Sequence, residues 1–176
     1  MNRLLTLGAA LGVLAVGAAP TLAQGPPMPQ PTAEHELLQR DVGTWHAAMK
    51  MWMGPGDPME SQGTETVSML GPFWQVSKFE GSFMGQSFAG TGWMGWDPEK
   101  KQYVSAWVDS MTPTISHGSA TWDAATRTFS GTMTGVGPDG SPQTMETTVS
   151  YPEEGKRLFT MKVAGQTTME ITYTKQ

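Results

Sequence analysis

Residues 90–111 read Gly90-Thr91-Gly92-Trp93-Met94-Gly95-Trp96-Asp97-Pro98-Glu99-Lys100-Lys101-Gln102-Tyr103-Val104-Ser105-Ala106-Trp107-Val108-Asp109-Ser110-Met111, and they predict one long β-hairpin. Two aromatic, β-prone runs flank the polar segment 97–101. Its proline is preset for the second position of a turn, and its aspartate can accept hydrogen bonds from the amides that follow. Because side chains alternate along a strand, one face of the second run carries Tyr103, Ser105, Trp107 and Asp109.

The same alternation continues along most of the chain. We count about ten strand-like runs, at 44–53, 61–70, 73–83, 87–96, 102–109, 114–122, 127–136, 143–151, 157–163 and 168–174. Segments rich in Gly, Pro and Asp separate most of them, as expected for tight turns. The expected fold class is therefore all-β, an antiparallel up-and-down barrel of about ten strands, since closure removes exposed sheet edges. Residues 32–40 predict a short helix that caps one end.

The first residues have the features of a targeting segment. Asn2 and Arg3 form a short basic start, residues 4–19 are apolar and uncharged, and small residues lead to a cleavage position after Ala23. We therefore expect a signal peptide over 1–23, a proline-rich linker over 24–31 and a single barrel domain over 32–176. Cleavage would leave a periplasmic or secreted protein with no stable membrane anchor, and an uncleaved anchor is the alternative.

Composition excludes several classes of function. The net charge is −5 and no run of basic residues occurs, so a nucleic-acid partner is not expected. The chain has no cysteine, which excludes disulfides and thiol chemistry. It also lacks a G-x-S-x-G elbow, an H-E-x-x-H helix and a phosphate-binding loop, and we expect no enzymatic activity. The oligomeric state stays open.

Several motifs resemble known families. Gly43-Thr44-Trp45 resembles the G-x-W start of lipocalin-like (calycin) barrels. Over residues 34–176 the chain resembles the uncharacterised bacterial domain of unknown function 1579. The resemblance rests on Met51-Trp52-Met53-Gly54-Pro55-Gly56, Met84-Gly85-Gln86-Ser87-Phe88-Ala89-Gly90, Gly95-Trp96-Asp97, Lys101-Gln102-Tyr103-Val104, Trp107-Val108-Asp109-Ser110-Met111 and Glu170-Ile171-Thr172-Tyr173-Thr174-Lys175. Trp96 departs from the family, which usually has tyrosine there. The resemblance implies a calycin-like barrel and no activity.

The apolar faces of the strands suggest a binding function. In the first run one face carries Trp45, Ala47, Met49, Met51 and Met53. Methionine is flexible and polarizable, and it is common at adaptable apolar binding surfaces as well as in ordinary cores. The expected function is thus a secreted barrel that binds a small apolar molecule, provided that its interior is hollow. The candidate ligand-binding residues are Trp45, Met49, Met51, Trp93, Trp96, Tyr103, Trp107 and Asp109.

Two interpretations stay open for Asp109, which either orients a ligand or accepts hydrogen bonds from the amides of Met111 or Thr112. The alternative to ligand binding is a structural or protein-interaction module. It would use aromatic residues that alternation leaves exposed, namely Trp52, Trp74 and Trp122.

Metal and haem binding are further alternatives. His46 with Met49 and Met51 suits Cu(I) by ligand type, but alternation places His46 on the opposite face from the methionines. His117 is a lone candidate haem ligand on a later strand. We therefore expect no cofactor and assign no residue as a metal ligand.

Overall fold

The computed structural model describes residues 28–137 and 139–176. The expected signal peptide and residues 24–27 of the expected linker lie outside this part of the chain. The elements in order are α1 (Ala33–Leu38), the 3-10 helix η1 (Gln39–Asp41), β1 (Gly43–Met51), β2 (Met59–Leu70), β3 (Trp74–Phe83), β4 (Gln86–Asp97), β5 (Gln102–Asp109), β6 (Ser116–Asp123), β7 (Thr128–Val136), β8 (Pro142–Ser150), β9 (Lys156–Val163) and β10 (Gln166–Lys175).

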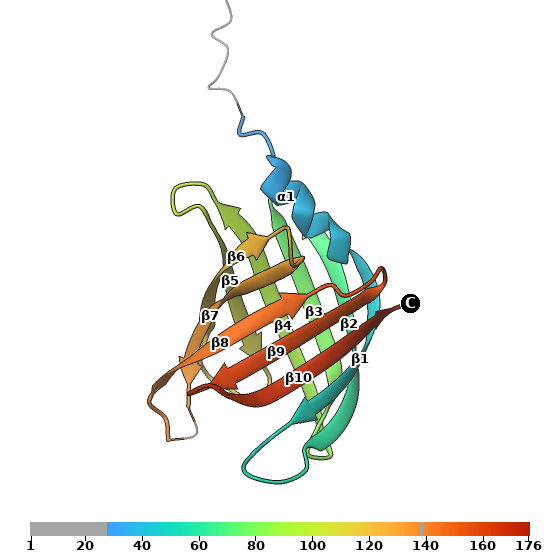
Figure 1. The fold of residues 1–176 in the computed structure, drawn as a ribbon, viewed down its shortest axis with the longest axis vertical. Coiled ribbons are helices and arrows are strands. Elements are labelled where there is room, and N and C mark those ends of the chain that lie inside the picture. The colour runs from blue at the N-terminus through green and yellow to red at the C-terminus, as the bar shows by residue number, and fades with distance from the viewer. Residues whose placement is uncertain (1–27, 138) are drawn as a thin grey trace, which may run out of the picture. The chain divides into compact units, whose positions relative to one another are not determined.

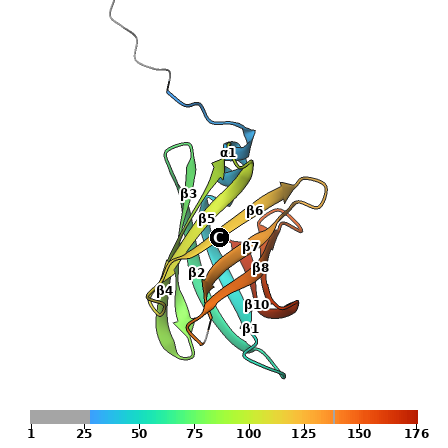
Figure 2. The ribbon, with the colours of Figure 1, turned by 90° about the vertical axis from the view of Figure 1, so that its left-hand side faces the viewer.

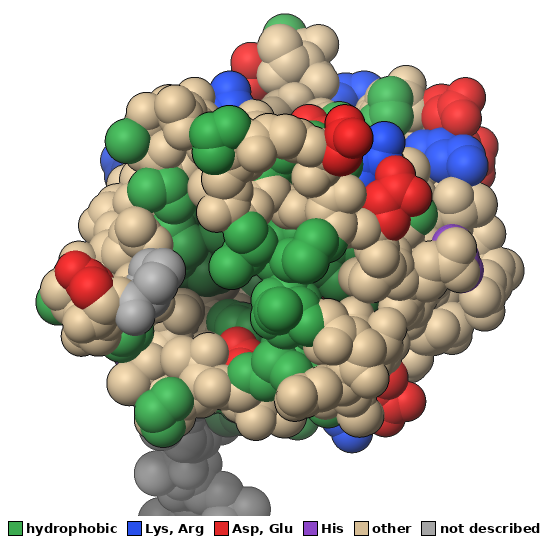
Figure 3. All heavy atoms as spheres, turned by 90° about the horizontal axis from the view of Figure 1, so that it is seen from below, with side chains coloured by type: hydrophobic (Ala, Val, Ile, Leu, Met, Phe, Trp, Pro, Cys, Tyr) green, Lys and Arg blue, Asp and Glu red, His purple; other side chains and the backbone are tan. Residues whose placement is uncertain are grey.

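The strands form one closed barrel, as predicted. Each strand pairs antiparallel with its neighbours in sequence, and β1 pairs with β10 to close the sheet (Figures 1 and 2). The ten predicted runs correspond one to one with β1–β10, with ends shifted by at most two residues. The helix α1 lies at one end of the barrel, here called the helix end. Because the strands run alternately up and down, every second loop lies at the same end. The loops that follow β1, β3, β5, β7 and β9 surround the other, here called the open end, which Figure 3 shows from below.

Side chains fill the helix end. Leu38, the N-cap residue of η1, packs with Tyr103, Phe129 and Tyr151 in one buried cluster. The hydroxyl of Tyr103 donates a hydrogen bond to the carbonyl oxygen of Glu34 at 3.1 Å, which ties α1 to β5. Burial raises the pKa of Tyr103 to about 12, so this hydroxyl stays protonated and able to donate. Among the residues that the structure covers, neither helix has the length and apolar character needed to cross a membrane.

The expected exposure of three tryptophans is correct only for Trp74, which is 42% exposed. Trp52 is half-buried after the end of β1. Trp122 is half-buried against Phe129, with 4.7 Å between ring centroids. It faces inward because its cross-strand partner is Phe129, an inner residue, and directly opposed residues share a face.

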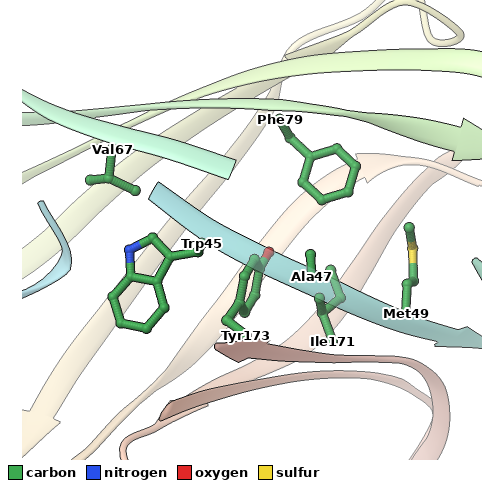
Figure 4. Close-up of a cluster of buried hydrophobic side chains, with 7 residues drawn as sticks. All are labelled: Trp45, Ala47, Met49, Val67, Phe79, Ile171 and Tyr173. Carbon is green, nitrogen blue, oxygen red and sulfur yellow. The ribbon is translucent and has the colours of Figure 1, made fainter. Parts of the chain in front are cut away.

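A second cluster lies on the inside of β1, β2, β3 and β10. It consists of Trp45, Ala47, Met49, Val67, Phe79, Ile171 and Tyr173, and Figure 4 shows these side chains gathered between the strands. Met53, expected on the same face, lies beyond the end of β1 and is 70% exposed. In β1 this cluster extends as far as Met49, two residues before the strand ends, so the interior is packed from the helix end to near the open end.

A buried group of charges joins this cluster to the helix end. Arg157 forms an ion pair with Glu65, and its Nη1 lies 3.3 Å from Asp41 Oδ2. The guanidinium carbon lies 4.0 Å from the ring centroid of Tyr173 and 4.7 Å from that of Trp45. Burial raises the pKa of the Glu65 carboxyl, and attraction to Arg157 acts in the opposite direction.

Asp41 is the second buried acid of this group and the point at which η1 is anchored. Its Oδ2 accepts hydrogen bonds from the Tyr151 hydroxyl at 2.8 Å and from Gln75 Nε2 at 3.3 Å. Its carbonyl oxygen accepts one from Trp45 Nε1 at 2.7 Å. These contacts fix the segment between α1 and β1 inside the barrel.

We predict that Arg157→Leu strongly destabilises the fold, because it leaves Glu65 and Asp41 buried without a counter-charge. The expected loss in free energy of unfolding is about 3–5 kcal/mol, measured by urea denaturation. The control is Lys50→Leu, which removes an exposed pair with Glu60 and should cost about 0–1 kcal/mol. Equal losses in the two variants would contradict a stabilising role for the buried charges.

Candidate functional site

The inner surface near the open end is lined by methionines. Hydrophobic side chains gather in the centre of this end, surrounded by polar and backbone atoms (Figure 3). Six adjacent strands, from β7 through the β10–β1 closure to β2, each place a methionine on the inner face toward the open end. We call this set the methionine arc, and it comprises Met133, Met145, Met161, Met169, Met51 and Met59.

The strand register makes four of these residues direct neighbours. The cross-strand partners form an unbroken row across β2, β1, β10 and β9, in the order Met59, Met51, Met169 and Met161. Directly opposed residues point to the same face, with Cβ atoms about 4.5–5.5 Å apart. The row lies inside because Met51 and Met169 pack against the buried cluster around Trp45 and Tyr173.

The other two methionines continue the arc. Met133 opposes Met145 in the β7–β8 pair. Met145 is two residues from Thr147, which opposes Met161, so Met145 and Met161 are diagonal neighbours on one face. The terminal methyl carbon of Met145 also lies 3.6 Å from the position of a Cβ at Gly135, an inner residue of β7. Flexible thioether side chains thus cover more than half of the circumference.

The facing wall carries aromatic residues and one carboxylate. The ring of Trp107 lies directly over Gly90 of β4, where a Cβ would overlap it. Asp109 Oδ2 accepts a hydrogen bond from Trp107 Nε1 at 3.1 Å. Its Oδ1 accepts from the amides of Met111 at 2.9 Å and Thr112 at 2.8 Å. The interpretation of Asp109 as a turn acceptor is therefore confirmed, and the residue also orients Trp107.

A cavity of about 340 Å³ lies at this end, between β2 and the β3–β4 hairpin. The paired part of β2 and β3 ends at Gly63 and Gly81, and the strands separate beyond these residues. The cavity is lined by Met51, Met59, Glu60, Ser61, Ser82, Phe83, Met84 and Gly85. A recess of about 270 Å³ on the outside of β10, β1 and β2 is lined mainly by outward polar residues, which do not suit an apolar ligand.

The structure brings together only part of the candidate ligand-binding set. Met51, Trp107 and Asp109 line the inner face beside the packed cluster, toward the open end. Met49 belongs to the packed cluster itself and is 6% exposed. Trp45, Trp96 and Tyr103 belong to the packed clusters, with 5.0 Å between the ring centroids of Trp96 and Tyr103.

Trp93 is not in the interior at all. It opposes Val76 and Ala106 on the outer face and is 38% exposed. Gly92 and Trp96 face inward, so the residue next to Gly92 faces outward. The prediction that Trp93 shares one site with Trp96 and Trp107 was therefore wrong. Sequence reasoning also left Met59 and Phe88 out of the site, although Phe88 packs against the buried cluster. Alternation read from Gly90 along β4 places Phe88 on the inner face.

The histidine-based metal and haem sites are not supported by the register. His46 opposes Thr64 and Thr174 on the outer face, away from Met49. His117 opposes Ala106 and Thr134 and is exposed. Within residues 28–137 and 139–176 no group of three or more His, Asp or Glu side chains is arranged to hold a metal ion. The hypothesis of copper bound by His46 together with Met49 and Met51 is therefore wrong.

We predict that Gly90→Ala displaces the Trp107 ring, because the added methyl group occupies the space of the ring. The expected loss in free energy of unfolding is about 1–3 kcal/mol, with a red shift of tryptophan emission as the ring becomes more exposed. Gly54→Ala is the control, since a Cβ at residue 54 meets no atom within 4 Å. Similar behaviour of the two variants would contradict the close packing of Trp107 on Gly90.

Comparison with known proteins agrees with this architecture. The protein called Rv2717c from M. tuberculosis is 9% identical, with a TM-score of 0.58 over 84% of this chain and 99% of that chain. The S-type phycobiliprotein lyase CPES from Guillardia theta is 11% identical, with a TM-score of 0.53 over 83% of this chain and 98% of that chain. These likenesses show a shared lipocalin-like barrel fold, and no curated protein sequence matches the chain. The family model described as "Protein of unknown function (DUF1579)" matches residues 30–175, which confirms the resemblance seen in the sequence: the chain belongs to the DUF1579 family.

Proposed function

We propose that the barrel binds one small, largely apolar molecule at its open end. The observation that carries the proposal is the 340 Å³ cavity at the open end, which is lined by Met51 and Met59 of the methionine arc. Its volume is near the lower limit of the range for small-molecule sites, which favours a compact ligand or one chain of a larger molecule. We propose binding without catalysis.

The lining suits such a ligand. Methionine side chains adapt their shape to an apolar surface and interact favourably with aromatic or unsaturated groups. Phe83 supplies a rigid face, and Ser61, which faces inward, supplies a polar group that can orient the ligand. The mixture of a broad apolar wall with few polar groups is typical of lipophile carriers.

The structural neighbours support the fold and do not identify a ligand. The barrel from Guillardia theta is a phycobiliprotein lyase by name, and at 11% identity it shares the architecture alone. The proposal therefore rests on the open end of this chain. Export, proposed from residues 1–23, would place the carrier in the periplasm or outside the cell.

We predict that Ser61→Phe blocks the cavity. Ser61 opposes Met49 on the inner face and lines the cavity, so a phenyl ring there occupies the space of the ligand. Affinity for the apolar fluorescent probe N-phenyl-1-naphthylamine should fall about tenfold or more, which corresponds to about 1.4 kcal/mol. The measurement is a fluorescence titration of the purified protein.

The control is Ser68→Phe, the same substitution at an exposed outer position of β2, which should leave probe affinity unchanged. Organic-solvent extraction of the protein purified from its native host, followed by mass spectrometry, would identify the natural ligand. Equal affinity of both variants, together with an empty extract, would reject the proposal. That result would favour the alternative of a protein-interaction module, with exposed Trp74 and Trp93 on neighbouring strands as its binding surface.

A further inference from the structure

We propose that the thioether sulfurs of Met51, Met169 and Met161 form a binding site for one Cu(I) ion. The three residues lie on the consecutive strands β1, β10 and β9. Cu(I) is a soft ion that thioether ligands select, and three sulfur atoms complete a trigonal site. This site uses neither His46 nor any other histidine.

The register gives the three side chains a common target. Met169 opposes Met51 on one side and Met161 on the other, so the three form an unbroken row on one face of the sheet. Adjacent Cβ atoms in such a row are about 4.5–5.5 Å apart. A methionine has three rotatable bonds beyond Cα, which lets the two outer sulfurs turn toward the central one. Met59, opposite Met51, extends the row and offers a fourth sulfur.

The surroundings favour a soft ion over a hard one. Met51 and Met169 pack against the buried cluster that contains Met49 and Ile171, and all three proposed ligands are half-buried. The neighbouring inner positions include the hydroxyl groups of Thr147 and Ser61 but no carboxylate, so they lack the set of carboxylate ligands typical of Mg²⁺ and Ca²⁺ sites. The absence of an acidic or histidine cluster among the described residues likewise disfavours Zn²⁺ and Cu(II).

The charge of the opening also favours a cation. Asp109, on the facing wall, is held by three N–H donors, and no Lys, Arg or His of the described chain forms a salt bridge with it. Asp57 and Asp139 lie in loops of the same end. Negative charge around an apolar opening raises the local concentration of a monovalent cation.

The Cu(I) site and the proposed apolar-ligand site can be tested separately, because leucine preserves apolar volume but has no sulfur. The test variant is the triple substitution Met51→Leu, Met161→Leu and Met169→Leu. The control is a triple substitution of exposed methionines outside the row and the cavity, Met28→Leu, Met53→Leu and Met111→Leu. Both variants lose three thioethers, so only the position of the sulfur atoms differs between them.

The measurement is anaerobic titration with Cu(I) in competition with the chelator bicinchoninate, for the protein from which residues 1–23 have been removed by its export route. We expect one tightly bound Cu(I) per chain in the parent protein and in the control variant. The test variant should bind Cu(I) about 100-fold more weakly, while its far-UV circular dichroism spectrum stays that of the parent protein. X-ray absorption of the parent complex should show sulfur as the nearest ligand.

Three results would overturn the Cu(I) proposal: no Cu(I) retained against the chelator, equal affinity of the test variant, or nitrogen or oxygen as the main ligands. Circular dichroism and urea denaturation of the test variant report on its fold independently of either site. If the triple variant does not fold, the single variant Met169→Leu removes the central sulfur and should weaken Cu(I) binding about tenfold. If the Ser61→Phe variant no longer binds the probe but still binds Cu(I), the metal site does not depend on the apolar-ligand site.

Discussion

A single buried guanidinium organises the helix end of the barrel. Arg157 of β9 requires counter-charges because an isolated ion in this interior would be strongly disfavoured. Glu65 supplies one from β2, and Asp41 supplies the other from η1, which must therefore enter the barrel. The rings of Trp45 and Tyr173 cover the guanidinium from β1 and β10, the two strands that close the sheet. The contacts of this one side chain thus hold the closing strands together, dock the helical segment and fix the strand register.

The same arrangement divides the interior into two parts of different character. Aromatic rings fill the helix end and meet at centroid distances of 4.7–5.0 Å, as between Trp96, Tyr103, Phe129 and Trp122. Such packing leaves little freedom for a ligand. Toward the open end methionines join a few phenylalanines in the lining, and the ring of Trp107 lies over Gly90. Because Gly90 has no side chain, the Trp107 ring can lie against the barrel wall instead of projecting into the lumen. The adaptable part of the lining is therefore confined to the open end.

The sequence alone was sufficient for the strands but not for the interior. Alternation with a period of two residues located all ten strands, because each half-buried strand carries that signal locally. It also separated His46 from Met49. The same rule applied from Trp107 through its partner Gly92 would have placed Trp93 outside, but that step requires the hairpin register. Glu65 and Arg157 are 92 residues apart, and the methionines of the arc come from six strands, so their association depends on barrel closure. No local pattern contains that information.

The structural charge cluster and the candidate site are linked through the strands that they share. Arg157 and Met161 lie on β9, Tyr173 and Met169 on β10, and Trp45 and Met51 on β1. An extended strand rises about 3.3 Å per residue and can hardly be stretched further, so fixing the position of one residue fixes the positions of those further along. Arg157 opposes Tyr173, and the register set there continues without a shift to the pair Met169 and Met161, before the irregularity between Met169 and Thr167. The charges at the helix end therefore determine which side chains meet at the open end. A flexible lining can form a defined site in this barrel because its backbone is held from the opposite end.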